Sequence, residues 1–164
     1  MKLKGNNVLV YGLGKTGKEL VKFLLFEGAT VFVYDDNQKE KIKNTLVFDC
    51  NLDFSILHFV VISPGIGQTI LTKKLEEYKI PTISEIELAC RFITKSKIIA
   101  ITGTNGKTTT TKLVSQIFKR ANYNFTMCGN VGEPLVSFLK NDGQNHFFVI
   151  EISSFQLERT LSLK

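Results

Sequence analysis

The sequence has no long apolar run and few cysteines. None of its hydrophobic stretches approaches the roughly 20 residues of a membrane-spanning helix, and its first residues lack the apolar segment of a signal peptide. Its three cysteines, Cys50, Cys90 and Cys128, are odd in number and far apart. This spacing argues against a disulfide framework or a zinc site and is typical of reduced thiols. We therefore expect a cytoplasmic protein without membrane insertion.

Basic residues are in excess but do not form a block. The chain has 21 Lys and Arg against 15 Asp and Glu, a net charge of +6, and the lysines are scattered rather than interleaved with aromatic residues. This pattern argues against a nucleic-acid partner. It favours a lysine-rich solvated surface, with attraction of a polyanionic small substrate as the second interpretation.

Apolar runs and helical periodicities alternate along the 164 residues. Strands are predicted at 7–11, 30–34, 46–48, 59–62, 80–83, 98–102, 125–127 and 147–150. Helices are predicted at 16–26, 69–78, 85–92 and 135–139, and in the stretch that follows residue 107. This alternation predicts an α/β fold with parallel sheets.

A domain boundary is expected where the periodicity is lost. Residues 93–97 are polar and carry no helical or strand pattern. We therefore assign a first domain to residues 1–93, a linker to 94–97 and a second domain to 98–164. The second segment offers only about three strands, fewer than a typical sheet of this class.

A glycine-rich turn, Gly12-Leu13-Gly14-Lys15-Thr16-Gly17, lies between the first predicted strand and helix. Such a turn lets a diphosphate approach the backbone, and Asp35, at the end of the next strand, can accept a hydrogen bond from a ribose or a base. The motif does not separate NAD from another nucleotide diphosphate. The loop Ser63-Pro64-Gly65-Ile66 is expected to face this turn, as a ligand-lining loop or only as a rigid turn.

A second turn, Gly103-Thr104-Asn105-Gly106-Lys107-Thr108, joins an apolar strand to an amphipathic helix. It is shorter than the common P-loop, which would need glycine where this chain has Ile101. Lys107 is predicted to contact the β- and γ-phosphates of ATP, and Thr108 to hold Mg²⁺. Glu151, directly after a buried strand, is predicted to be a second Mg²⁺ ligand. The polar residues after Glu151 can donate to a substrate; they are Ser153, Ser154 and Gln156.

The segment Thr102–Thr109 resembles the ATP loop of the Mur ligases, the amide-forming enzymes of peptidoglycan precursor synthesis, which have the same shortened form. Four further segments resemble the D-glutamate-adding members of that family: Gly12–Gly17, Ser63–Ile66, Gly129–Gly132 and Glu151–Glu158. The resemblance implies a Rossmann-like sheet domain followed by the first part of a P-loop ATPase α/β domain. It also implies a cytoplasmic, monomeric ligase of cell-wall synthesis that uses ATP and Mg²⁺.

The resemblance further implies the role of each site residue. The substrates that the resemblance implies are UDP-N-acetylmuramoyl-L-alanine and D-glutamate, which would be joined through an acyl phosphate. Residues expected at the UDP substrate are Gly14, Lys15, Thr16, Asp35, Ser63, Pro64, Gly65, Asn130, Ser153 and Gln156. Residues expected at ATP are Gly103, Thr104, Asn105, Gly106, Lys107, Thr108 and Thr109, with Lys107 and Glu151 in the catalytic step. Asp36 stands where a threonine is often found, so no uridine contact is assigned to it.

Members of the family continue through the rest of the ATPase domain and a third domain. Those parts supply an activating histidine, a modified lysine, the adenine contacts and the D-glutamate pocket. We therefore expect this chain to be an amino-terminal portion that does not ligate by itself.

Two other classes of function remain open from the residues alone. A nicotinamide-dependent oxidoreductase would use the first glycine turn and Asp35, but leaves Lys107, Thr108 and Glu151 unexplained. The second class is a non-catalytic nucleotide-binding module that regulates a partner. Within the enzyme class, folylpolyglutamate synthetase has a similar ATP loop but lacks the preceding domain.

Overall fold

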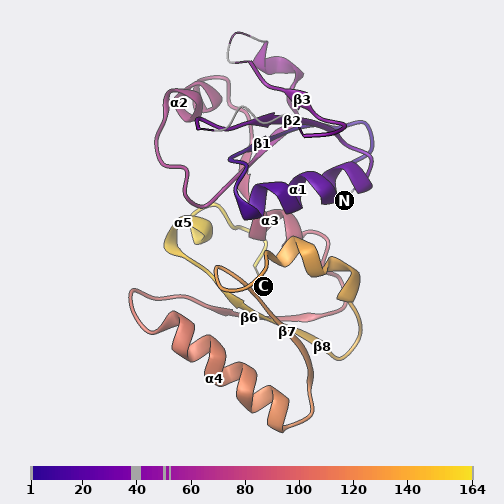
Figure 1. Ribbon diagram of the computed structural model, residues 1–164, viewed down its shortest axis with the longest axis vertical. Coiled ribbons are helices and arrows are strands. Elements are labelled where there is room, and N and C mark those ends of the chain that lie inside the picture. Colours follow the sequence, from indigo (N-terminus) through magenta and orange to yellow (C-terminus); the bar gives the residue numbers. More distant parts are fainter. Residues whose placement is uncertain (1, 38–41, 50, 52, 164) are drawn as a thin grey trace. The chain divides into compact units, whose positions relative to one another are not determined.

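Two parallel β-sheets organise the chain (Figure 1). The computed structural model describes residues 2–37, 42–49, 51 and 53–163. Contacts divide the chain into two units, Met1–Glu85 and Ile86–Lys164. All strand pairs in both sheets are parallel, which confirms the predicted α/β class. Within the described ranges, no helix has the length and apolar character needed to cross a membrane.

The first unit is a five-stranded sheet with helices on both faces. Its elements are β1 (Asn7–Tyr11), α1 (Lys15–Phe26), β2 (Thr30–Tyr34), β3 (Leu46–Val47), the 3₁₀ helix η1 (Phe54–Ile56), β4 (Phe59–Ile62), α2 (Ile70–Glu77) and β5 (Thr82–Ser84). The strand order is β3-β2-β1-β4-β5. Chain order therefore reverses beside β1, and in open α/β sheets ligands bind at this point, beyond the carboxyl ends of the strands.

The register brings three loops to this edge of the sheet. Tyr11, the last residue of β1, pairs with Tyr34 on one side and with Ile62 on the other. The three strands therefore end at the same level. The turn that begins at Gly12, the acidic pair after β2 and the loop that begins at Ser63 all start there.

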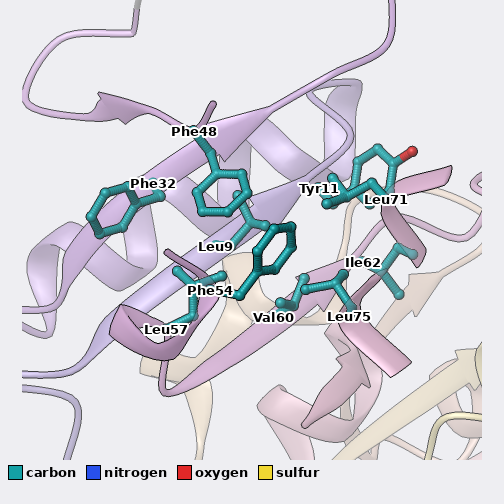
Figure 2. Packing of buried hydrophobic residues seen from close by; sticks show 10 residues of the cluster. All are labelled: Leu9, Tyr11, Phe32, Phe48, Phe54, Leu57, Val60, Ile62, Leu71 and Leu75. Atoms are coloured by element: carbon teal, nitrogen blue, oxygen red, sulfur yellow. The ribbon is translucent and has the colours of Figure 1, made fainter. Parts of the chain in front are cut away.

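An apolar cluster fills one face of this sheet, beneath η1 and α2 (Figure 2). Leu9 and Tyr11 alternate with Val8 and Val10 along β1, so the strand buries residues on both faces. Phe48 packs edge-to-face against Phe54, with 5.3 Å between the ring centroids. Helix α1 contacts β1 and β2, and its buried residues Leu20, Val21 and Leu24 carry the predicted helical spacing.

The second unit contains a three-stranded sheet in the order β6-β8-β7. Its elements are α3 (Glu85–Cys90, which begins one residue before the unit), β6 (Lys97–Ile101), α4 (Lys107–Arg120), β7 (Asn124–Gly129), the 3₁₀ helix η2 (Leu135–Asn141), β8 (His146–Glu151) and α5 (Ser154–Leu157). Phe148 and Ile150 of the central strand pack with α3 and η2 in one core. Phe147 points to the other face, where its ring lies 5.0 Å from that of Phe118 on α4.

Helix α3 packs with the second sheet, although the sequence places it in the first domain. Ile86, Ala89 and Cys90 belong to the same core cluster as Phe148, so the second unit begins before the predicted boundary at residue 93. The predicted linker, residues 94–97, runs into β6. The Asp142 carboxylate accepts hydrogen bonds from the backbone N–H groups of Thr94, Lys95 and Ser96, which fix this turn.

Several predicted elements differ in bounds or type. The predicted strand 80–83 is Thr82–Ser84, and the predicted helix 135–139 is the 3₁₀ helix η2. On α4, Leu113 and Ile117 are more than half exposed, whereas Thr111 and Ser115 are buried. The Thr111 hydroxyl donates to the Lys107 carbonyl at 2.8 Å, whereas the buried Ser115 Oγ has no hydrogen-bond partner among the described residues.

Candidate functional site

The second glycine turn is shaped by its backbone conformation. Gly103 has φ +147° and Gly106 has φ +76°, and Gly106 is the N-cap of the 14-residue helix α4. The left-handed conformation at Gly106 is one that a residue with a β-carbon adopts only at a cost. No side chain caps the helix, and its first turn holds no acidic residue. The positive end of α4 and its first N–H groups are therefore available to an anion.

Lys107 lies over this turn. Its Nζ donates to the Gly103 carbonyl at 2.6 Å and to the Thr104 carbonyl at 3.4 Å. The ammonium group is thus on the exposed surface of the loop, within the region that the helix terminus makes positive. This arrangement suits a mobile cation that exchanges loop carbonyls for phosphate oxygens.

Glu151 faces the first turn of α4 from the end of β8. Its side chain lies on the same face of the strand as that of Phe147, because the two are four residues apart. Glu151 is 1% exposed, and its Oε2 accepts a hydrogen bond from Thr108 Oγ1 at 2.8 Å. The structure therefore brings together the two residues that were predicted to hold Mg²⁺.

Asn130 is the second partner of Glu151. Its Nδ2 donates to Glu151 Oε1 at 2.9 Å, and its backbone N–H donates to the Glu151 carbonyl at 2.8 Å. The contact arises because β7 and β8 pair Gly129 with Glu151. Sequence reasoning placed Asn130 near the substrate and missed this contact, since a one-residue offset across a strand pair leaves no local pattern.

The oxygen ligands at Glu151 and Thr108 fit a magnesium ion. The site offers one carboxylate and one hydroxyl, both hard oxygen ligands. Among the residues that the structure describes, no three His, Cys, Asp or Glu side chains group together as a metal site. A small ligand set of this kind suits Mg²⁺, which keeps several waters and binds substrate phosphates.

Ser153 and Gln156 form a reciprocal cap at the start of α5. Gln156 Oε1 accepts from the backbone N–H and the hydroxyl of Ser153, each at 3.0 Å, and Ser153 Oγ accepts from the Gln156 N–H at 3.3 Å. Gln156 is 3% exposed, whereas Ser153 is half-buried and Ser154 is exposed. Gln156 therefore orients Ser153 through these hydrogen bonds. The role of Gln156 at a substrate stays a prediction.

The first glycine turn is held by side chains from the neighbouring strands. Asp35 accepts from the Leu13 N–H at 2.6 Å, and Ser63 Oγ donates to the Gly12 carbonyl at 2.9 Å. A β-carbon at Gly17 would collide with the Gly12 carbonyl oxygen, so this position requires glycine. Gly14 is the N-cap of α1, and Lys15 and Thr16 form its first turn without a side-chain cap. The turn is thus prearranged around a helix N-terminus.

Tyr11 connects this turn to the acidic residue that departs from the family pattern. The Tyr11 hydroxyl donates to Asp36 Oδ2 at 2.6 Å and lies 2.9 Å from Thr69 Oγ1. Burial and the bond to Asp36 raise the pKa of Tyr11 above its ordinary value, so the phenol stays protonated. No local sequence pattern indicates this contact, because Tyr11 lies in an apolar strand segment. Pro64 is half-buried and Gly65 exposed in the adjacent loop.

Two comparisons with known proteins find similar sequences. Residues 101–164 match the family model described as Mur ligase middle domain. Along nearly its whole length the chain is similar to proteins named UDP-N-acetylmuramoylalanine--D-glutamate ligase. The chain belongs to the Mur ligase family. This Mur ligase sequence is 40% identical to the Caldicellulosiruptor bescii protein, 42% to that of Caldicellulosiruptor saccharolyticus and 39% to that of a Thermoanaerobacter species.

The matches cover nearly all of this chain but a much smaller share of each relative. The matches span 96%, 96% and 100% of this Mur ligase chain, in the order given above, but only 37%, 38% and 39% of those relatives. The chain therefore spans less than two fifths of the length of these curated relatives.

Proposed function

We propose that the gene product containing these 164 residues is an ATP-dependent ligase that adds D-glutamate to UDP-N-acetylmuramoyl-L-alanine in the cytoplasm. The observation that carries the proposal is the Thr108–Glu151 contact of 2.8 Å at the N-terminus of α4. It joins an anion-binding helix start to a buried carboxylate, which is the pairing that Mg²⁺ and nucleotide phosphates require. The name of the relatives supplies the acceptor and the amino acid.

In this proposal the first unit binds the UDP portion. The N–H groups at the start of α1 face the diphosphate, with Lys15 as the cation. Asp35 already holds the Leu13 N–H, so it fixes the turn while its remaining acceptor capacity serves the base. The residues assigned to this part are Gly14, Lys15, Thr16, Asp35, Ser63, Pro64 and Gly65.

In the second unit, Thr108 and Glu151 would hold Mg²⁺, and the loop Gly103–Thr109 would hold the phosphates of ATP. Bound ATP supplies a phosphoryl group to the substrate carboxylate, and the D-glutamate amine then displaces phosphate from the acyl phosphate. Lys107 offsets the negative charge on the phosphoryl group in transfer. Asn130 keeps the Glu151 carboxylate oriented, and Ser153, held by Gln156, contacts the muramoyl-alanine part.

Calorimetric titration of the 164-residue chain tests the binding part of the proposal. We expect UDP-N-acetylmuramoyl-L-alanine and Mg·ATP to bind, and NADH to bind no better than ADP-ribose. Tight NADH binding without binding of the UDP compound would favour an oxidoreductase. For the reaction, we expect the gene product to release phosphate only when ATP, the UDP compound and D-glutamate are all present. Phosphate release that does not depend on D-glutamate would contradict the assigned amine.

A further inference from the structure

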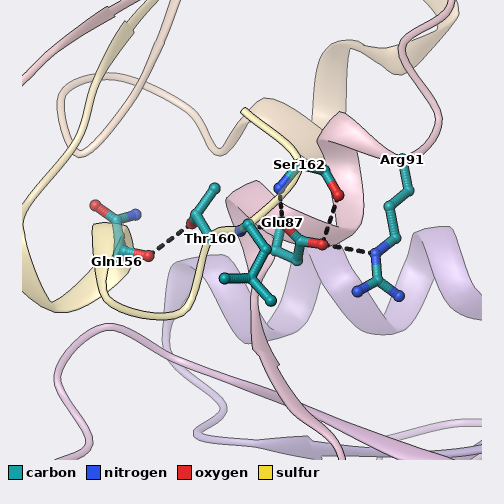
Figure 3. Close-up of polar contacts among 6 residues, drawn as sticks. Glu87, Arg91, Gln156, Thr160 and Ser162 are labelled. Atoms are coloured by element: carbon teal, nitrogen blue, oxygen red, sulfur yellow. Dashed lines mark hydrogen bonds and ion pairs between the residues drawn. The ribbon is translucent and has the colours of Figure 1, made fainter. Parts of the chain in front are cut away.

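A buried carboxylate outside the proposed site anchors the end of the chain segment that carries Ser153 (Figure 3). Glu87 belongs to α3, and its side chain is 0% exposed. An unpaired carboxylate in such a position would strongly destabilise the fold. The hydrogen-bond partners of Glu87 therefore indicate its role. These partners include Leu161 and Ser162, beyond the Ser153–Gln156 cap along the chain.

Three donors to Glu87 come from two consecutive residues. The Leu161 and Ser162 N–H groups each donate to Oε2 at 2.7 Å, and Ser162 Oγ donates to Oε1 at 2.8 Å. Arg91 Nε donates to the same Oε1 at 2.7 Å. Burial alone would raise the pKa of Glu87, but the bonds from Ser162, Arg91 and Leu161 outweigh burial and hold the pKa below its ordinary value.

Few side chains of the segment between Glu151 and Ser162 are buried. They are Ile152, Gln156 and Thr160, four residues apart, and the Thr160 hydroxyl donates to the Gln156 carbonyl at 2.7 Å. The apolar side chains on its outer side are exposed: Phe155 by 67%, Leu157 by 38% and Leu161 by 86%. With so little apolar burial, polar anchoring at the ends decides how firmly such a segment is held.

We propose that Glu87 is a positioning residue for the Ser153–Gln156 rim, acting through the clamp that it forms on Leu161 and Ser162. One end of the segment is fixed by β8 at Glu151 and the other by Glu87. Between them, Thr160 fixes the last turn of α5, and the Ser153–Gln156 cap fixes its start. Release of the clamp therefore frees the rim, while Lys107 and the α4 N-terminus keep their positions. The ligand served by the rim rests on the proposed function; the clamp itself does not.

Hydrogen–deuterium exchange of the 164-residue chain tests the clamp. Glu87→Gln keeps the shape of the side chain but turns an amide NH₂ toward a donor. We expect exchange at the amides of residues 153–162 to accelerate about tenfold, the equivalent of one lost hydrogen bond of about 1.4 kcal/mol, with β8 unchanged. Glu158→Gln, an exposed change on the same segment, is the control and should leave exchange unaltered. Unchanged exchange in Glu87→Gln would overturn the clamp.

Binding constants test the positioning role separately. In Glu87→Gln we expect the Kd for UDP-N-acetylmuramoyl-L-alanine to rise severalfold, up to about tenfold, while the Kd for Mg·ATP stays within about twofold. An equal loss of both affinities would show a general structural role and overturn the proposal. If Glu87→Gln does not fold, Ser162→Ala, which removes one donor, should move the same two readouts in the same direction by less. If the wild-type chain binds no UDP compound, the proposed function fails, and the exchange data alone decide whether Glu87 fixes the rim.

Discussion

The two glycine turns of this chain each contain a position that needs glycine, Gly17 and Gly106, and the two positions need it for different reasons. In the first turn, Gly17 is required because another backbone atom occupies the space of a β-carbon, and Asp35 and Ser63 brace the loop. In the second turn, the space around a β-carbon at Gly106 is empty, and the backbone itself is left-handed. The first turn is therefore part of the packing of its unit. The second is a loop held by few contacts, whose purpose should appear in ligand binding rather than in stability.

The largest expected effect comes from filling the crowded position. Gly17→Ala forces the β-carbon against the Gly12 carbonyl, and we expect the free energy of unfolding of the first unit to fall by about 3 kcal/mol. Denaturant unfolding measures this loss. Gly14→Ala is the matched control, since no atom lies near its β-carbon and its φ is −63°, and it should cost less than about 1 kcal/mol. Similar losses in both variants would contradict the packing explanation.

Removing the buried charge beside the second turn should weaken metal-dependent binding. Glu151→Gln keeps the side-chain shape between Thr108 and Asn130 but loses the negative charge. We expect the Kd for Mg·ATP to rise about tenfold, while the Kd for ATP measured with EDTA changes little. Calorimetry at both conditions provides the comparison. Equal losses with and without Mg²⁺ would remove Glu151 from the metal site.

A substitution at Gly106 tests the cost of the left-handed backbone alone, because no atom lies near a β-carbon there. Gly106→Ala places alanine at φ +76° in open space, and we expect a loss of about 1 kcal/mol in the free energy of unfolding of the second unit. The loss should thus be smaller than that of Gly17→Ala. If Gly106→Ala proved the more damaging of the two, the contrast between the turns would be reversed.

The smallest effect concerns Asp142, which clamps backbone N–H groups at the start of β6 as Asp35 clamps the first turn. Burial raises the pKa of Asp142, but hydrogen bonds from Thr94, Ser96 and Lys95 outweigh burial and leave the pKa below its ordinary value. Its contribution to stability is therefore present above the unfolded-state pKa of about 3.9 and is lost as pH falls through the folded-state pKa. Asp142→Asn should flatten the fall in unfolding free energy below about pH 4. If Asp142→Asn left the fall in unfolding free energy below about pH 4 unchanged, the Asp142 hydrogen bonds would not be its cause.

Local patterns predicted the elements and the pairing of Thr108 with Glu151. Apolar runs such as Phe59–Ile62 become strands because both faces of a parallel sheet are covered. The shortened loop and a carboxylate after a buried strand meet because parallel strands end at one edge. The placement of α3, in contrast, depends on which sheet buries Ile86, and no local pattern encodes that choice.

Contacts between segments that lie far apart in the sequence could not be predicted from local patterns either. Tyr11 and Asp36, or Glu87 and Ser162, are polar partners brought together only by tertiary packing. Gln156 was predicted as a donor to substrate, and this role stays a prediction. Its Oε1 accepts from Ser153 in the cap, since a Ser-x-x-Gln spacing also satisfies a helix start. The same spacing thus permits a structural and a binding role, and only the geometry separates them.

The central claim is that the two turns bind different ligands, the UDP compound at the first and Mg·ATP at the second. Titration of both ligands into the wild-type chain and Lys107→Ala tests it most directly. In the described structure the hydrogen bonds of the Lys107 ammonium group go to loop carbonyls at Gly103 and Thr104, so the variant should fold as the wild type does. We predict that Lys107→Ala loses about 100-fold in affinity for Mg·ATP and keeps its affinity for UDP-N-acetylmuramoyl-L-alanine. Unchanged Mg·ATP affinity, or equal loss of both ligands, would contradict the account.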